Sequence, residues 1–171
     1  MNLDWVCASW VHAHQNPSLR AAMAALSAVT GSKACCIAAA AVAGLWLFRG
    51  RFTRGAILFF GTALSAILVE ILKGVFQRDR PPFSNIYDSY SFPSGHALSS
   101  TVFFGLLAWS FGLDFPARRK VFGGMAAASA VGVGCSRIYL GVHWPTDVIG
   151  GIVMGILFMK GWLWCAEKQS S

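Results

Sequence analysis

Five long stretches without charged residues constrain this chain more than any other feature: residues 34–48, 55–69, 97–113, 121–136 and 148–159. Each is shorter than the ~20 residues that a helix needs to cross the hydrocarbon core, but amphipathic or aromatic flanks extend each to spanning length. Charged residues make up 12% of the chain and hydrophobic residues 56%. A water-facing surface needs more polar side chain than this, so the sequence predicts an integral membrane protein.

The predicted fold is an all-α membrane bundle of about five transmembrane helices. The fifth span is the least regular because Lys160 interrupts it, and this side chain can snorkel to the interface. A moderately apolar stretch from Pro17 to Ser32 is too short to span and predicts a helix lying in the interface. A re-entrant helix or a sixth span stays open for it. The expected divisions are an N-terminal segment (1–32), a transmembrane core (33–166) and a C-terminal tail (167–171).

The distribution of Lys and Arg predicts the orientation of the bundle. The formal net charge is +7, but the basic residues lie between apolar runs, which argues against nucleic acid as a partner. The basic loops 49–54 and 118–120 fall on one side of the membrane if the spans alternate, and the positive-inside rule makes that side cytoplasmic. We therefore expect the N-terminus and the other two loops to face outward from the cell membrane, toward the periplasm in a cell that has one.

Three polar clusters lie at the outward ends of the predicted spans: residues 73–81, 93–96 and 136–147. Alternating crossings bring all three to one face of the membrane. Ionisable groups there are costly unless they have partners, and few acidic side chains are available. The pattern predicts a site for an anionic group.

The residue types in these clusters suit a phosphoryl group. Lys73, Arg80 and Arg137 supply positive charge, and the guanidiniums offer forked donors that match phosphate oxygens. Ser94 and Gly95 stand where the third span begins, so free backbone N–H groups and the helix dipole also favour an anion.

Two histidines remain for covalent and acid–base chemistry. Asp147 follows His143 by four residues, so its carboxylate can accept one imidazole N–H and leave the other nitrogen free to attack. His96, next to the predicted phosphate site, is placed to protonate the departing oxygen. No carboxylate cluster suggests a metal, so the expected site uses neither metal nor cofactor, and the cationic side chains neutralise the charge.

The order Lys-x6-Arg-Pro, Pro-Ser-Gly-His and Ser-Arg-x5-His-x3-Asp resembles the type-2 phosphatidate phosphatase and vanadium haloperoxidase superfamily. The resemblance covers roughly residues 15 to 166. It implies phosphate ester or anhydride hydrolysis through a phosphohistidine on His143, with His96 as the general acid. The phosphoryl group would be bound by Lys73, Arg80, Ser94, Gly95 and Arg137. Many members have six spans, and this chain departs from them at its N-terminus.

The resemblance and the predicted topology together imply a membrane lipid phosphatase, with undecaprenyl diphosphate as the leading substrate. Phosphatidylglycerophosphate, phosphatidate and a lipid A phosphate are alternative substrates. A lipid phosphotransferase would use the same residues. A haloperoxidase is disfavoured by the apolar spans, and a non-enzymatic lipid transporter would need neither histidine. The oligomeric state stays open.

Several neighbouring features have a structural interpretation. Glu70 lies one turn before Lys73 and is expected to pair with it. Arg78 and Asp79 are interpreted as a solvated local pair outside the site. Small residues at helix-packing spacing predict close helix contacts in the fourth and fifth spans, at Gly124, Ala128, Gly132, Gly151 and Gly155.

Overall fold

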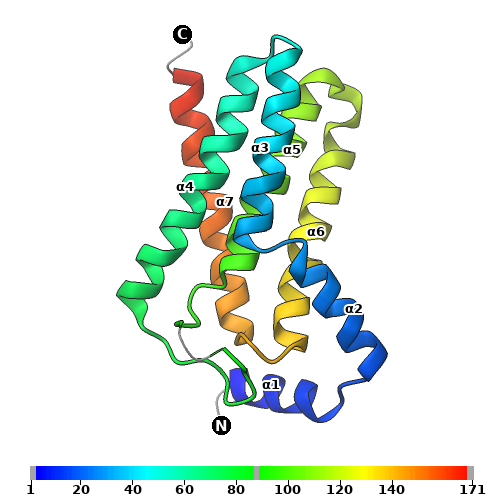
Figure 1. The fold of residues 1–171 in the computed structure, drawn as a ribbon, viewed down its shortest axis with the longest axis vertical. Helices are drawn as coiled ribbons and strands as arrows, with labels where there is room; N and C mark the ends of the chain where they lie inside the picture. The colour runs from blue at the N-terminus through cyan, green and yellow to red at the C-terminus, as the bar shows by residue number, and fades with distance from the viewer. Residues whose placement is uncertain (1–2, 87–88, 169–171) are drawn as a thin grey trace.

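The computed structural model describes residues 3–86 and 89–168, and these residues form a helical bundle (Figure 1). The α-helices are α1 (Leu3–Ala13), α2 (Pro17–Ala28), α3 (Ser32–Phe48), α4 (Phe52–Phe76), α5 (Gly95–Asp114), α6 (Arg119–Tyr139) and α7 (Pro145–Lys168). A 3₁₀ turn at Pro116–Arg118 precedes α6. The all-α fold class is confirmed. Residues 169–171 of the predicted C-terminal tail lie outside the described residues.

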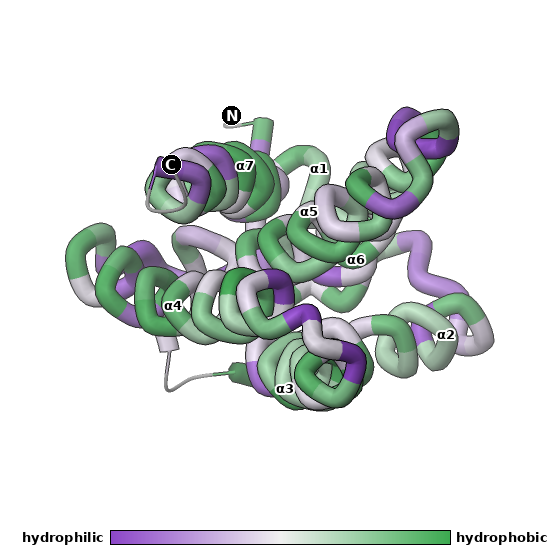
Figure 2. Tube along the Cα trace, turned by 90° about the horizontal axis from the view of Figure 1, so that it is seen from above, coloured by the Kyte–Doolittle hydropathy of each residue, from purple (hydrophilic) through white to green (hydrophobic). Residues whose placement is uncertain are grey.

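Four helices are long and apolar enough to cross a membrane, and the pair α2–α3 meets the same test as one span bent by 50°. The described chain therefore has four to five candidate spans, in agreement with the predicted five. Figure 2 shows hydrophobic residues along most of the length of α4 and α7. These helices expose large apolar side chains such as Ile67, Ile71 and Leu157, as expected for surfaces that face lipid.

Helix α5 is the centre of the bundle and packs against α3, α4, α6 and α7. Its apolar window is 56% buried, compared with 39% or less in the other three candidate spans. Leu98, Val102 and Leu106 on α5 are almost completely buried and pack with Leu58 and Val69 of α4. The N-terminus of α5 is therefore held firmly, which fixes the position of the Ser-Gly-His motif.

The N-terminal segment differs from the expected single interfacial helix. Residues 3–13 form the additional helix α1, which lies across one end of the bundle (Figure 1). Asn16 caps α2 by accepting hydrogen bonds from Ser18 N at 2.9 Å and Leu19 N at 3.2 Å, and Pro17 occupies the first turn. Helix α2 packs against α6 and continues into α3 after the bend, so it belongs to the wall of the bundle.

The two basic loops lie at the opposite end from α1. There Arg54 Nη1 donates to Asp114 Oδ1 at 2.6 Å, and Arg51 pairs with the same carboxylate. These contacts join the α3–α4 loop to the end of α5. The predicted placement of both basic loops at one end of the bundle is confirmed, because α3, α5 and α7 run toward that end (Figure 1).

Only part of the predicted small-residue packing is observed. A Cβ on Gly155 would lie 2.9 Å from Thr101 Cβ and 3.0 Å from Leu98 O, so α7 approaches α5 closely there. Gly151 makes a similar approach to α5. The prediction is wrong for Gly124 and Gly132, around which a Cβ would meet nothing within 4 Å. The regular spacing of small residues along α6 does not show which face of this helix packs against another helix.

Replacing Gly155 with Ala should lower the free energy of unfolding by about 1–3 kcal/mol, because the added methyl group overpacks the α5–α7 contact. Gly161→Ala in the same helix is the matched control, since nothing lies within 4 Å of its Cβ position. It should leave the stability unchanged or slightly higher. Thermal unfolding in detergent measures both, and equal melting temperatures for the two variants would contradict the packing argument.

Candidate active site

The three polar clusters predicted from the sequence meet at the end of the bundle that α1 crosses (Figure 1). Lys73 lies in the last turn of α4, and Arg80 lies in the connection from α4 to α5. His96 is in the first turn of α5, and Arg137 is in the last turn of α6. The loop before α7 contains His143, and Asp147 is in the first turn of that helix.

His143 and Asp147 form a buried pair. The exposed fractions of the two residues are 2% and 0%. His143 Nδ1 lies 3.4 Å from Asp147 Oδ2, and this oxygen also accepts the backbone N–H of Trp144 at 2.8 Å. The carboxylate is therefore fixed on the Nδ1 side of the ring, and Nε2 is left for other chemistry.

The surroundings of His143 keep its ring neutral. Burial lowers the pKa of His143 to about 4, and the positive charges of Arg80 and Arg137 act in the same direction, against the opposing effect of Asp147. His143 Nε2 lies 3.4 Å from Arg80 Nη1. At neutral pH the ring is thus an unprotonated base with its free nitrogen beside a guanidinium.

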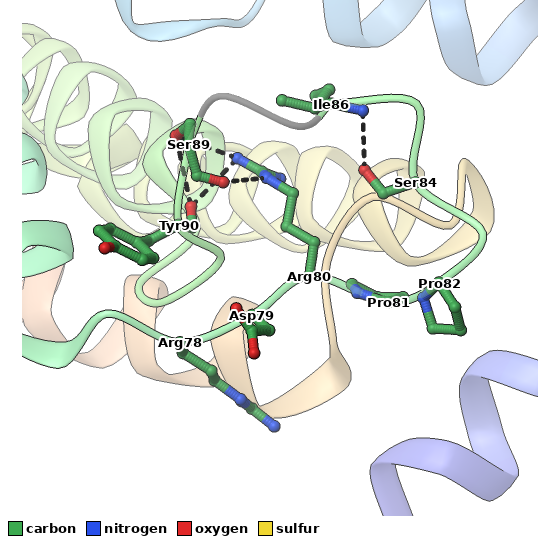
Figure 3. A pocket seen from close by; sticks show the side chains of 9 residues that line it. All are labelled: Arg78, Asp79, Arg80, Pro81, Pro82, Ser84, Ile86, Ser89 and Tyr90. Atoms are coloured by element: carbon green, nitrogen blue, oxygen red, sulfur yellow. Dashed lines mark hydrogen bonds between the residues drawn. The ribbon is translucent and has the colours of Figure 1, made fainter.

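The guanidinium of Arg80 is held by backbone carbonyls (Figure 3). It donates to Val142 O at 2.7 Å, Ser89 O at 2.7 Å and Tyr90 O at 3.1 Å. Burial lowers the pKa of Arg80 from its ordinary value. These carbonyls orient the guanidinium without neutralising its charge.

The side chain of Lys73, like that of Arg80, contacts Ser89. Its Nζ donates to Ser89 Oγ at 3.0 Å and to Glu70 Oε1 at 3.3 Å. The predicted Lys73–Glu70 pairing is confirmed, and it lies at the surface because the Glu70 side chain is 72% exposed. Ser89 therefore accepts hydrogen bonds from both Lys73 and Arg80. It occupies donors that could otherwise bind an anion.

The start of α5 has a buried hydroxyl group, Ser94 Oγ, without a hydrogen-bond partner among the described residues. The backbone N–H of Ser94 donates to Asp147 O at 3.0 Å, which joins the start of α5 to the start of α7. A Cβ on Gly95 would lie 3.0 Å from Val69 Cγ1. Close packing against α4 is thus a second reason for glycine here.

Arg137 and His96 lie together on the α2 side of the site. Arg137 is 7% exposed, and its Nη1 donates to Ser27 Oγ. Its Nε has no partner within residues 3–86 and 89–168. Both side chains line a cavity of about 370 Å³ that α2 closes on one side. This arrangement places a buried guanidinium and an imidazole in one space.

Arg80 also lines a larger cavity of about 500 Å³ (Figure 3). Its walls come from the α4–α5 connection, at residues 78–82, 84, 86, 89 and 90. Neither histidine lines it, whereas His96 lines the smaller cavity beside Arg137.

The interpretation of Arg78 and Asp79 as a solvated pair is wrong. Arg78 Nη1 donates to Asp147 Oδ1 at 2.6 Å, and its Nη2 donates to Asp4 Oδ2 at 2.7 Å. The Arg78 guanidinium also stacks over the Trp144 ring, 5.6 Å from its centroid. Arg78 is therefore attached to the site through Asp147.

Asp4 on α1 is a second residue that the sequence analysis missed. It is 4% exposed and accepts hydrogen bonds from Thr146 N at 3.0 Å and from Arg78. Although burial opposes its ionisation, the hydrogen bonds from Thr146 and Arg78 hold the pKa of Asp4 below its ordinary value. Nothing in the local sequence marks this residue, because its partners are more than 70 positions away along the chain.

Among the described residues, no group of three or more His, Cys, Asp or Glu side chains could hold a metal ion. The charge of an anion at this site would be met by three protein cations: Lys73, Arg80 and Arg137. Together with a neutral imidazole and the start of a helix, they form a set of groups able to bind and transfer a phosphoryl group.

Comparisons with known proteins agree with this geometry. Residues 54–171 match the PAP2 superfamily. The chain is 38% identical over 106 residues to phosphatidylglycerophosphatase B of Bacillus subtilis (strain 168), covering 59% of this chain and 51% of the relative. It is 32% identical over 123 residues to a putative undecaprenyl-diphosphatase of Escherichia coli (strain K12), covering 66% of this chain and 58% of the relative. The chain spans about half the length of these curated relatives.

A solved structure extends the likeness to nearly the whole chain. The transmembrane PAP2-type phosphatidylglycerolphosphate phosphatase from Bacillus subtilis superposes with a TM-score of 0.83 at 27% sequence identity. The match covers 96% of this chain and 85% of that structure. The overall fold is therefore a known one.

The imidazole of His143 should stay neutral down to about pH 4. In the unfolded chain the ring takes up its proton near pH ~6.5. Between these two values the unfolded state binds more protons, so the contribution of His143 to the free energy of unfolding falls as the pH is lowered. Imidazole resonances of the protein in detergent, assigned with a His143→Gln variant, measure the titration. A midpoint near 6.5 would contradict the described environment.

Proposed function

Since the chain belongs to the PAP2 superfamily, we propose that it is an integral membrane lipid phosphatase that works through a phosphohistidine on His143. The observation that best supports this function is the buried, neutral imidazole of His143, held by Asp147 on one side and next to Arg80 on the other. A nucleophilic histidine needs both its unprotonated form and a free nitrogen directed at the substrate.

In this proposal Lys73, Arg80 and Arg137 bind the phosphoryl oxygens. Ser94 Oγ and the backbone amides at Gly95 complete the binding site, and the unpartnered state of that hydroxyl supports its assignment. The incoming phosphate takes over the donors of Lys73 and Arg80 that now contact Ser89. Because Ser89 is an uncharged partner, a phosphate dianion competes with it favourably.

The proposed reaction has two steps. His143 Nε2 attacks the phosphorus, the bond to the lipid oxygen breaks, and His96 donates a proton to that oxygen. In the second step His96 takes a proton from a water molecule, whose oxygen attacks the phosphohistidine and releases phosphate. The positive side chains stabilise the charge that develops on the phosphoryl oxygens, so the reaction needs no divalent metal.

We propose that the site faces outward from the cell membrane, because the two basic loops lie at the opposite end of the bundle and the positive-inside rule makes that end cytoplasmic. A site at the lipid–water boundary suits an amphiphile whose tail stays in the bilayer. Undecaprenyl diphosphate is the leading substrate, followed by phosphatidylglycerophosphate, phosphatidate and a lipid A phosphate. The names of the two curated relatives refer to the first two of these lipids.

Arg78 and Asp4 act as positioning residues in this proposal. Arg78 donates to one oxygen of Asp147, and Trp144 N donates to the other, which lies 3.4 Å from His143 Nδ1. Asp4 in turn holds Arg78 from α1. A carboxylate fixed at both oxygens keeps the imidazole in one orientation and one tautomer.

Purified protein in detergent should release phosphate from a lipid diphosphate or monophosphate in the presence of excess chelator. His143→Ala should abolish release, because the nucleophile is lost, and His96→Ala should reduce kcat by about 10²–10⁴-fold. His14→Ala is the matched control, since this histidine lies on the exposed end of α1 and stacks on Trp10. Phosphate release that requires added metal, or that survives in His143→Ala, would contradict the mechanism.

Product analysis distinguishes a hydrolase from a phosphotransferase. Inorganic phosphate should account for all phosphoryl groups lost from the substrate, even when a second lipid alcohol is present. Appearance of a phosphorylated acceptor lipid would show transfer instead.

Arg78→Gln should lower kcat by about 10- to 100-fold with little change in KM, because positioning groups of this kind act on the reactive residue and not on substrate binding. Arg78→Lys should recover part of the loss, since it restores one charged contact to Asp147. Arg118→Gln, an exposed arginine at the other end of the bundle, is the control. A rise in KM at unchanged kcat would assign Arg78 to substrate binding instead.

A further inference from the structure

The cavity beside His96 and Arg137 extends beyond the groups that the proposed phosphoryl transfer uses. Its volume is about 370 Å³, and it opens between α2 and the segment at Asn85 and Ile86. His96, the proposed proton donor, lies on its wall. This cavity is therefore the space on the leaving-group side of the reaction.

Arg20 of α2 lines this cavity and has no part in the site described above. Its Nη1 donates to Gln15 Oε1 at 2.8 Å, and Gln15 Nε2 donates to Tyr139 O at 2.6 Å. The N–H of Asn16 also donates to the Tyr139 hydroxyl at 2.7 Å. These bonds attach the start of α2 to the end of α6, two residues beyond Arg137. Arg20 is exposed, and its hydrogen bond to Gln15 links its guanidinium to this attachment.

The charge in this cavity is positive. Its lining contains two guanidiniums, Arg20 and Arg137, and no carboxylate among the described residues. The buried Nε of Arg137 lacks a partner within the described chain. Because Arg137 is assigned to the transferred phosphoryl group, Arg20 is the guanidinium left for a second anionic group near the departing oxygen. An uncharged leaving group would give Arg20 no ionic partner.

We propose that this cavity binds a second phosphate, the one that leaves with the lipid, and that Arg20 thereby selects lipid diphosphates over lipid monophosphates. The inference rests on the proposed function and narrows its substrate class. When His143 takes the terminal phosphoryl group of a diphosphate, the bridging P–O bond breaks and its electron pair stays on the lipid phosphate. The proton from His96 goes to that oxygen, and Arg20 stabilises the remaining charge of this phosphate. A lipid monophosphate leaves as an alcohol, which has no second phosphate for Arg20 to bind.

The test compares two substrates that share one short tail, farnesyl diphosphate and farnesyl monophosphate, in detergent. Arg20→Gln should lower kcat/KM for the diphosphate about tenfold or more, as expected for loss of a charge-assisted hydrogen bond. The same variant should leave the monophosphate within about twofold of the unsubstituted protein. Arg20→Lys should retain part of the selectivity, and Arg118→Gln should retain all of it.

The outcomes separate the inference from the proposed function. An equal loss on both substrates, or no loss on either, would overturn the role of Arg20 while phosphatase activity stands. Activity of the unsubstituted protein on the monophosphate alone would also overturn it. Absence of phosphate release from both substrates would instead contradict the proposed function itself.

A second variant guards against loss of folding. Gln15→Leu leaves Arg20 intact but removes its anchor, so it should weaken the preference for the diphosphate in the same direction with a smaller effect. Unchanged selectivity in a stably folded Gln15→Leu protein would overturn the inference.

Discussion

A carboxylate with no exposed surface lies at the start of α7, and much of the architecture around the site exists to satisfy it. Asp147 receives the N–H of Trp144 and the guanidinium of Arg78, and it faces His143. Burying an ionised group without such partners would cost several kcal/mol. Because the partners come from separate segments, meeting this requirement draws the α4–α5 connection and the α6–α7 loop onto one helix end. The Arg78–Asp4 pair extends the same network to α1.

The positive charge of the site follows from the scarcity of acidic groups around it. Arg80 contacts backbone carbonyls and the neutral Ser89, and Arg137 contacts the neutral Ser27, so these two charges are oriented but not neutralised. Lys73 contacts Ser89 and also pairs with the exposed Glu70. In an environment of low dielectric constant such cations attract an anion strongly. Burial is the main cause of the lowered pKa of His143, and the charges of Arg80 and Arg137 add to it. In the proposed mechanism, one arrangement therefore prepares both the binding of phosphate and the nucleophile.

Features that depend on residues close together in the sequence were predicted correctly, whereas features that depend on distant residues were not. Spans α4 to α7 follow from local hydropathy, and the pairing of Lys73 with Glu70 follows from helical spacing. Local hydropathy did not predict the helix α1 or the bend between α2 and α3. Both α1 and α2 pack against α6, and α1 also contacts Thr146 through Asp4. Arg78 was misassigned since its nearest acidic neighbour in the sequence, Asp79, is not the carboxylate that it binds. Gly124 and Gly132 matched a packing pattern, yet they lie on an unpacked face of α6.

The sequence by itself determined that the chain is a membrane bundle with its polar motifs at one end. Hydrophobic length and the alternation of crossings require this whatever the details of packing. Only the tertiary structure decided which side chains surround the His143 ring and which line the cavity beside His96. Those choices depend on contacts between residues 70 to 140 positions apart, such as Asp4 with Arg78 and Gln15 with Tyr139. No local pattern records such contacts, because distance along the chain carries no information about which helix ends meet.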